Sequence, residues 1–131
     1  MTTDPTLITG VGTRAGFHIA RVFLQRGMPV IGTYRTWYPR LEELERLGAD
    51  LLNCDFDRQD EVERLISDVR ARHERLRGII HNASDWLRED DGVPVDEVIE
   101  KMMRIHASVP YQLNHQLAPL LEACKDAHAD I

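Results

Sequence analysis

Short apolar segments and longer helical patterns alternate along the chain. Four apolar runs rich in branched side chains occupy residues 7–9, 30–34, 50–54 and 78–81, and a helical pattern follows each of them. Parallel strands need long crossover connections, and those connections are usually helices. The alternation therefore predicts an α/β fold in which helices cover both faces of a parallel sheet.

The first two helical patterns each have one apolar face and a recognisable end. Their apolar positions are Gly16, Ile19, Ala20 and Phe23 in the first, and Leu41, Leu44 and Leu47 in the second. Gly27 and Gly48 come after these faces, at the place where glycine commonly ends a helix. We expect two amphipathic helices that stop at these glycines.

The third and fourth patterns also carry apolar residues at helical spacing. These are Val62, Leu65, Ile66 and Val69 in the third, and Val98, Met102, Ile105, Val109, Leu113 and Leu117 in the fourth, which runs over residues 95–123. Asp57 is the expected N-cap of the third helix. Pro110 and Pro119 lie inside the fourth pattern, and because proline removes a helical hydrogen bond we expect a kink or an early end there.

Composition and charge indicate one ordinary acidic domain. The 131 residues are 43% hydrophobic, enough for one core, and carry a net charge of −6. The arginines are spread along the chain instead of forming a stripe, so no nucleic-acid partner is expected. Residues 1–5 are polar and no apolar run reaches about 18 residues, so we expect no signal peptide, no membrane span and a cytoplasmic location.

The two cysteines, Cys54 and Cys124, lack the spacing of a metal site. We expect two reduced thiols and no metal, with a disulfide or ligand role as the alternative.

A glycine-rich turn separates the first apolar run from the first helical pattern. Residues 9–16 read Thr-Gly-Val-Gly-Thr-Arg-Ala-Gly. Glycines at such a place let the chain turn tightly and bring backbone N–H groups close to a pyrophosphate, while the helix N-terminus adds partial positive charge. We interpret the turn as a phosphate site for a dinucleotide, and a simple strand-to-helix loop is the alternative.

The spacing of Gly10, Gly12 and Gly16 resembles the Thr-Gly-x-x-x-Gly-x-Gly signature of the short-chain dehydrogenase/reductase family, with Arg14 in place of the middle glycine. That replacement is similar to the pteridine reductase branch, which includes bacterial dihydromonapterin reductases. The resemblance implies a Rossmann-type sheet with strand order 3-2-1-4. It covers about the first half of a family member, so residues 1–131 are expected to be the NADP-binding half of a single reductase domain, truncated before a fifth strand that would begin at 130–131.

The end of the second apolar run indicates which dinucleotide is bound. An NAD enzyme places an acidic residue there for the ribose 2′-hydroxyl, whereas this sequence has Arg35 followed by Thr36. A guanidinium can hold a 2′-phosphate through two hydrogen bonds and can stack on adenine. We therefore expect NADPH or NADP+ as the cofactor, and a solvated arginine in a loop is the alternative.

Further cofactor contacts are implied by the family resemblance. The pair Asp55-Phe56 resembles one that contacts adenine, although Asp55 could equally be a turn residue. Residues 82–84, Asn-Ala-Ser, resemble the segment that lies against the nicotinamide and its ribose. The implied cofactor contacts are Gly10, Gly12, Thr13, Arg14, Ala15, Gly16, Tyr34, Arg35, Thr36, Asp55, Phe56, Asn82, Ala83 and Ser84.

The same resemblance implies a substrate site. Arg14 and Ser84 would contact the substrate, and Trp86 has the position of an aromatic residue that stacks on the pterin in pteridine reductases. A flat heterocycle between two π-systems is a sound binding mode, and a loop aromatic at the edge of the core is the alternative for Trp86. The implied small-molecule substrate is a dihydropterin of the dihydromonapterin or dihydrofolate type.

The family's proton-donating Tyr-x-x-x-Lys pair does not occur in this sequence, and we expect it beyond Ile131. His106 lies where the resemblance places an Asn of the proton relay, and imidazole can hold a water or carry a proton. An ordinary helix histidine is the alternative for His106.

We predict an NADPH-dependent oxidoreductase. A non-catalytic NADP(H)-binding module or degenerate partner subunit is the second hypothesis. The expected open edge of the fourth strand and the exposed side of the fourth helix also predict a homo-oligomer, either a dimer or a tetramer.

Overall fold

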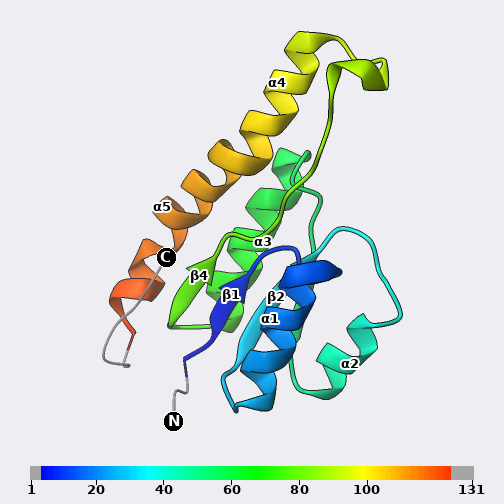
Figure 1. Ribbon diagram of the computed structural model, residues 1–131. Coiled ribbons are helices and arrows are strands. Elements are labelled where there is room, and N and C mark those ends of the chain that lie inside the picture. Colours follow the sequence, from blue (N-terminus) through cyan, green and yellow to red (C-terminus); the bar gives the residue numbers. More distant parts are fainter. Residues whose placement is uncertain (1–3, 125–131) are drawn as a thin grey trace.

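The computed structural model describes residues 4–124, and within this range the strands form one parallel sheet. The strands are β1 (Thr6–Ile8), β2 (Val30–Tyr34), β3 (Asp50–Asn53) and β4 (Gly78–Ile80). Their order is β3-β2-β1-β4 and each neighbouring pair is parallel (Figure 1). The predicted fold class and strand order are confirmed. The first three residues of the presumed polar N-terminus and the expected start of a fifth strand at 130–131 lie outside the described residues.

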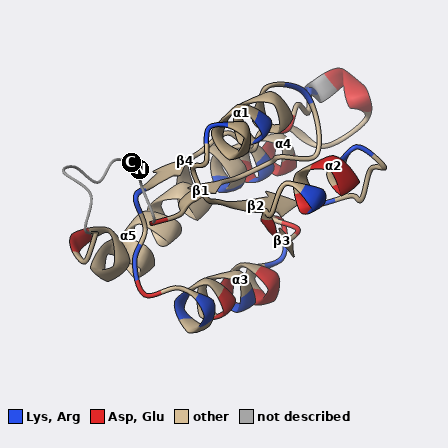
Figure 2. Cartoon of the chain, turned by 90° about the horizontal axis from the view of Figure 1, so that it is seen from below, with Lys and Arg blue, Asp and Glu red and all other residues tan. Residues whose placement is uncertain are grey.

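Helices cover both faces of the sheet because successive side chains of a strand point to opposite sides. Leu7 belongs to the cluster formed with α3 (Gln59–Arg72) and α5 (Val109–Glu122). Ile8 belongs to the cluster formed with α1 (Arg14–Gln25) and α2 (Leu41–Arg46). Figure 2 shows α1 and α3 on opposite sides of the strands. The sheet is therefore the middle of three layers, as the sequence predicts.

The first two helices end as expected but differ in one apolar position. Gly27 and Gly48 have φ values of +75° and +99° and follow α1 and α2. Leu41 and Leu44 are fully buried, whereas Leu47 is 40% exposed. The prediction for Leu47 is wrong because α2 has only 6 residues and ends before a third apolar side chain can turn toward the sheet.

The third helix buries the predicted face but begins one residue later than expected. Its buried residues are Val62, Leu65, Ile66 and Val69. The N-cap position is held by Arg58, so the assignment of Asp57 as N-cap is wrong. Instead, the N–H of Asp57 donates to Oδ1 of Asp55 at 2.9 Å, and its carboxylate lies 3.9 Å from Nζ of Lys101. Asp57 is thus part of the turn that Asp55 forms, and it does not cap α3.

The long fourth helix of the sequence prediction contains a π-helical turn in its middle. After the short 3₁₀ helix η1 (Glu89–Asp91), α4 (Val95–Met103) passes into a π-helical turn, η2 (Arg104–Ser108), from which α5 continues. The N–H of Val109 donates to the carbonyl of Arg104, five residues earlier. Pro110 has no N–H for a helical bond, and a widened turn gives its ring room. The helix ends at neither proline: it passes through the π-helical turn before Pro110, and Pro119 lies inside α5. The early end expected from the sequence is therefore wrong, and the irregularity at Pro110 is a change of helical winding.

All four strands point their carboxyl ends toward one edge of the sheet. The loops that follow β1, β2, β3 and β4 begin at residues 9, 35, 54 and 81. In open parallel sheets, ligands bind in the crevice at this edge. The fold thus brings the glycine turn, Arg35 and Asn82 to one place, although they are far apart in the chain.

Candidate functional site

A cleft of about 320 Å³ opens at the carboxyl edge of the sheet. Its walls come from the loops after all four strands, together with residues of α4 and η2. The predicted cofactor contacts that line it are Gly10, Gly12, Thr13, Arg14, Ala15, Tyr34, Arg35, Thr36, Asp55, Phe56, Asn82, Ala83 and Ser84. Gly16 is the one predicted contact outside this lining. The residues share one cavity, and their contact with a cofactor stays a prediction.

The glycine turn after β1 is held in shape by Thr33 of β2. The N–H of Gly10 donates to the Thr33 hydroxyl at 3.1 Å, and the N–H of Val11 donates to the Thr33 carbonyl at 2.9 Å. Gly10 has φ +72°, a conformation that favours glycine. A Cβ at Gly10 would lie 2.8 Å from Cα of Ala83. The turn therefore approaches the β4 loop too closely for a side chain at this position.

Gly16 packs the start of α1 against the turn. A Cβ at Gly16 would overlap the carbonyl oxygen of Gly10 and the side-chain amide of Asn82. At the N-cap, Thr13 makes no side-chain capping bond. The first amides of a helix have no intrahelical acceptor, and Arg14 and Ala15 in this first turn line the cleft. Such an uncapped helix end is suited to an anion.

Arg14 has a backbone conformation that favours glycine. Its φ is +52°, and the left-handed region costs a residue with a side chain roughly 1 kcal/mol or more. The family signature has glycine at this position, which the geometry explains. Strained residues are concentrated at functional sites, and the exposed Arg14 side chain lines the cleft.

Three hydrogen bonds fasten the β4 loop to the glycine turn. The buried hydroxyl of Thr9 accepts the N–H of Asn82 at 3.1 Å and that of Ala83 at 3.0 Å. The side-chain amide of Asn82 donates to the carbonyl of Gly10 at 3.0 Å. Ser84, which follows, is exposed at the cleft. Asn82 therefore has a structural role that the sequence reasoning did not include.

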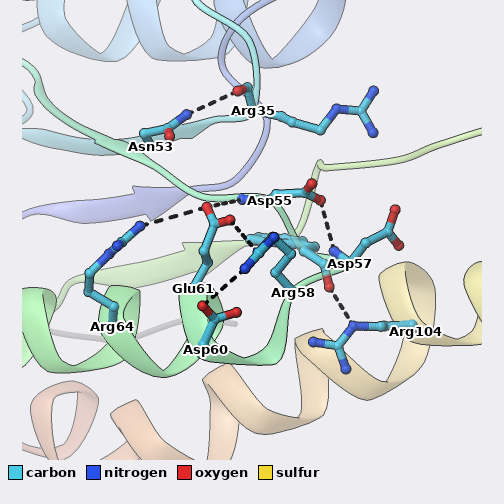
Figure 3. A network of polar contacts seen from close by, with 10 residues as sticks. Arg35, Asn53, Asp55, Asp57, Arg58, Asp60, Glu61, Arg64 and Arg104 are labelled. Carbon is cyan, nitrogen blue, oxygen red and sulfur yellow. Dashed lines mark hydrogen bonds and ion pairs between the residues drawn. The ribbon is translucent and has the colours of Figure 1, made fainter.

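The end of β2 presents Arg35 to the cleft. The side-chain amide of Asn53 holds the local backbone: it donates to the carbonyl of Tyr34 at 3.1 Å and to that of Arg35 at 3.0 Å (Figure 3). Nη1 of Arg35 donates to Oδ2 of Asp85 at 3.2 Å. This hydrogen bond is the largest cause that raises the pKa of Arg35. A charged guanidinium thus stands at the cleft wall.

The β3 loop joins the cleft to α3 and η2. The N–H of Asp55 donates to Oε1 of Glu61 at 3.1 Å (Figure 3). Nε of Arg104 in η2 donates to the carbonyl of Phe56 at 2.5 Å. Because Asp55 also accepts the N–H of Asp57, it is a turn residue, the alternative considered from the sequence, and it lines the cleft as well. Contact of Asp55 and Phe56 with adenine stays a prediction.

Both cysteines are free, and Cys54 lies buried at the cleft. Burial raises the pKa of the Cys54 thiol to about 12, so this thiol is neutral near neutral pH. Among residues 4–124, no three His, Cys, Asp or Glu side chains gather to suit a metal ion. That the protein uses no metal stays a prediction.

His106 lies beside the cleft in η2 and faces Ser84. Its Nδ1 is 3.0 Å from the carbonyl oxygen of Met102, and because a carbonyl only accepts, Nδ1 carries the proton. In the neutral ring Nε2 is then an acceptor, and the Ser84 hydroxyl lies 3.4 Å away from it. His106 can therefore orient Ser84. Its role in a proton relay stays a prediction.

Trp86 is 78% exposed and does not line the cleft. Such exposure disfavours the alternative that Trp86 covers the edge of the core. The ring is free to receive a flat ligand, but its stacking on a pterin stays a prediction, as do the substrate contacts of Arg14 and Ser84.

Several cleft residues were missed by reasoning from the sequence. They are Thr33, Tyr38, Cys54, Asp57, Asp85, Lys101, Met102 and Ile105. A signal existed for Thr33, since a hydroxyl inside a buried apolar run needs a partner. For Asp85 no sequence signal existed, because its partner Arg35 is 50 residues away.

Comparison with known proteins identifies relatives. A family model described as Enoyl-(Acyl carrier protein) reductase matches residues 10–126. The dihydromonapterin reductase of Klebsiella pneumoniae is 46% identical over 127 residues, which are 97% of this chain and 53% of that protein. The Escherichia coli protein of the same name is 42% identical over 127 residues, with the same shares covered. The chain spans about half the length of the curated relatives it matches.

Solved structures share the fold. The Pseudomonas aeruginosa RhlG/NADP active-site complex has a TM-score of 0.80 at 23% identity, over 97% of this chain and 51% of that one. A short-chain dehydrogenase from Streptomyces avermitilis has a TM-score of 0.78 at 23% identity, over 92% and 45% of the two chains. At this identity the likeness concerns the fold alone. The family model and the sequence relatives, however, show that this chain belongs to the short-chain dehydrogenase/reductase family.

Proposed function

We propose that this chain binds NADPH and forms part of a reductase that transfers hydride to a dihydropterin of the dihydromonapterin type. The observation that carries the proposal is the position of Arg35, at the end of β2 and at the cleft wall, where an NAD enzyme has an acidic residue. Relatives that are 46% and 42% identical and are named dihydromonapterin reductase support the substrate class.

The glycine turn and the start of α1 suit the pyrophosphate of the cofactor. Gly12 lines the cleft and has no side chain that would keep phosphate oxygens from the backbone. The uncapped amides at Arg14 and Ala15 are available as donors, and the partial positive charge of the helix end adds to them. The residues present therefore fit this part of the cofactor.

Arg35 suits the 2′-phosphate that distinguishes NADPH from NADH. Its guanidinium can donate two charge-assisted hydrogen bonds, which together contribute roughly 1–3 kcal/mol to binding at a solvent-exposed site. Thr36 lines the cleft next to it and offers a hydroxyl. No acidic residue follows β2 directly, so no carboxylate next to Arg35 in sequence repels the phosphate.

The substrate side of the cleft is formed by the β4 loop. Ser84 presents a hydroxyl that His106 can orient, and Arg14 adds a positive charge to the lining of the same cleft. The exposed ring of Trp86 offers a face to a pterin. Bound nicotinamide would supply the hydride, while these side chains would place the acceptor beside it.

We further propose that the protein is a homo-oligomer in the cytoplasm. Val95, Ile99 and Met103 are exposed, and their spacing of four places them on one face of α4. An apolar face of this kind favours association. Ile99→Glu should lower the mass measured by sedimentation velocity, and an unchanged mass would contradict the oligomer. Within residues 4–124 no helix is long and apolar enough to cross a membrane.

The direct test of the function is an assay of the protein encoded by the complete gene. NADPH consumption in the presence of dihydromonapterin should exceed consumption with NADH, and Trp86→Ala should raise the KM for the pterin far more than the KM for NADPH. Binding of NADPH without turnover of any dihydropterin would contradict the reductase and favour a non-catalytic module.

A further inference from the structure

The ion pair between Arg35 and Asp85 crosses the cleft above the strand that carries the glycine turn. Arg35 follows β2 and Asp85 follows β4, and these two strands flank β1 in the sheet. Nη1 and Oδ2 are 3.2 Å apart, and both side chains line the cleft. The pair therefore joins the side proposed to hold the adenosine phosphate to the side proposed to hold the substrate.

Each oxygen of the Asp85 carboxylate accepts one hydrogen bond. Oδ1 accepts the N–H of Trp86 at 2.8 Å, while Oδ2 accepts Nη1 of Arg35. Asp85 stands directly between Ser84 and Trp86 in sequence. The position of Arg35 is thus linked to the short segment that carries both of these residues.

A 2′-phosphate bound at Arg35 would meet the Asp85 carboxylate there. Both groups are anions, and like charges in contact repel each other. Asp55 and Asp57 also interact with Arg35, more weakly than Asp85 does. Side-chain exposures of 56% for Arg35 and 42% for Asp85 leave both groups free to rearrange, so one anion can replace the other at the guanidinium.

We propose that Asp85 is a specificity-determining residue that occupies Arg35 until the 2′-phosphate displaces it, and that this displacement releases the segment carrying Ser84 and Trp86. The proposal rests on the proposed role of Arg35 in binding NADPH. It predicts that binding of the 2′-phosphate, and not of the nicotinamide, changes the position of the segment that carries Ser84 and Trp86.

The first test compares ligands that lack the nicotinamide. Asp85→Asn removes the charge but keeps an oxygen for the Trp86 N–H, so the loop should fold normally. The variant should bind 2′,5′-ADP about 3-fold more tightly than the unmodified protein, the scale of a lost competing surface ion pair, and its affinity for 5′-AMP, which lacks only the 2′-phosphate, should be unchanged. Glu74→Gln is the control, because Glu74 is 88% exposed and precedes β4 at the opposite edge of the sheet. Unchanged or weaker binding of 2′,5′-ADP by Asp85→Asn would overturn the proposal.

The second test follows Trp86 directly. The chain has 2 tryptophans, so Trp37→Phe leaves Trp86 as the fluorescent reporter. Saturating 2′,5′-ADP should shift its emission, whereas saturating 5′-AMP should not, and adding Asp85→Asn should give the shifted emission without ligand. An emission that responds equally to both ligands would refute the coupling.

Failure of this proposal is distinguishable from failure of the proposed function. If the unmodified protein does not prefer 2′,5′-ADP to 5′-AMP, which differs from it only by the 2′-phosphate, Arg35 does not bind the 2′-phosphate and both proposals are refuted. If it does prefer 2′,5′-ADP, and Arg35→Ala removes the preference while Asp85→Asn changes nothing, only the role of Asp85 is refuted.

Discussion

The buried hydroxyl of Thr9 accepts the backbone N–H of Asn82 at 3.1 Å. The two residues are 73 positions apart, and the same hydroxyl accepts the next N–H along the chain. The bonds join the ends of β1 and β4, and so hold the glycine turn against the loop that would contact the nicotinamide. The shape of the cleft depends on a side chain that is not itself a candidate contact.

Thr9→Val should destabilise the protein by about 2 kcal/mol or more, because it leaves two backbone donors without an acceptor. Thr33→Val removes the acceptor of one donor, the N–H of Gly10, and should cost about 1 kcal/mol. Urea unfolding measures both changes, and Thr9→Ser, which keeps the hydroxyl, is the matched control. A smaller loss for Thr9→Val than for Thr33→Val would contradict the proposed importance of Thr9.

Alanine substitutions at two glycines of the turn should distinguish an effect on stability from an effect on NADPH binding. A Cβ at Gly12 would lie 3.4 Å from the Tyr38 ring, an ordinary contact, so Gly12→Ala should change the unfolding free energy by less than about 0.5 kcal/mol. The new methyl group would lie at the cleft beside Tyr38, so Gly12→Ala should weaken NADPH binding if the phosphate approaches the backbone at Gly12 and leave it unchanged otherwise. Gly16→Ala should destabilise the fold itself, since its Cβ would overlap Gly10. Equal stability of the two variants would argue against this assignment.

Arg14 allows the strain at the turn to be measured. Arg14→Gly and Arg14→Ala both remove the guanidinium, but only glycine relieves the φ of +52°. Arg14→Gly should therefore be more stable than Arg14→Ala by roughly 1 kcal/mol in denaturant unfolding. Both variants should lose affinity for NADPH to the same extent. If the alanine variant were the more stable one, the left-handed conformation at residue 14 would be wrong.

Cys54 should make stability depend on alkaline pH. Burial raises its pKa from the ordinary value of 9.0 to about 12, so between these values the unfolded chain loses a proton that the folded protein keeps. Stability is then fully present below pH 9 and falls as the pH rises toward 12, by at most about 1.4 kcal/mol per pH unit. Cys54→Ala should show a shallower decline in unfolding free energy over this range. Identical slopes would mean that the thiol is not buried.

The parts of the fold that were predicted correctly depend on local chemistry. Residues 30–34 form a buried strand because they are apolar and branched, and Gly27 and Gly48 end helices because glycine tolerates positive φ. The glycine turn and Arg35 were found at the cleft for the same reason, since each motif directly follows a strand. These features are set by neighbours in sequence.

The features that were missed depend on contacts between distant residues. Asp85 shows no local pattern, and its role appears only when the fold brings Arg35 within 3.2 Å of it. Asp57 has the side chain of an N-cap, but the carboxylate of Asp55 takes its N–H and the helix starts later. The hydrogen bond from Arg104 in the π-helical turn to the carbonyl of Phe56 likewise joins residues 48 positions apart and has no local sequence pattern.

The central claim is that Arg35 selects NADPH, and isothermal titration of Arg35→Ala with both cofactors tests it most directly. Loss of the charge-assisted hydrogen bonds should weaken NADPH binding by about 1–3 kcal/mol, roughly 5- to 150-fold, and leave NADH binding unchanged. Arg46→Ala, which removes an exposed arginine of α2 outside the cleft lining, should affect neither. Equal losses for NADPH and NADH in Arg35→Ala would contradict the account.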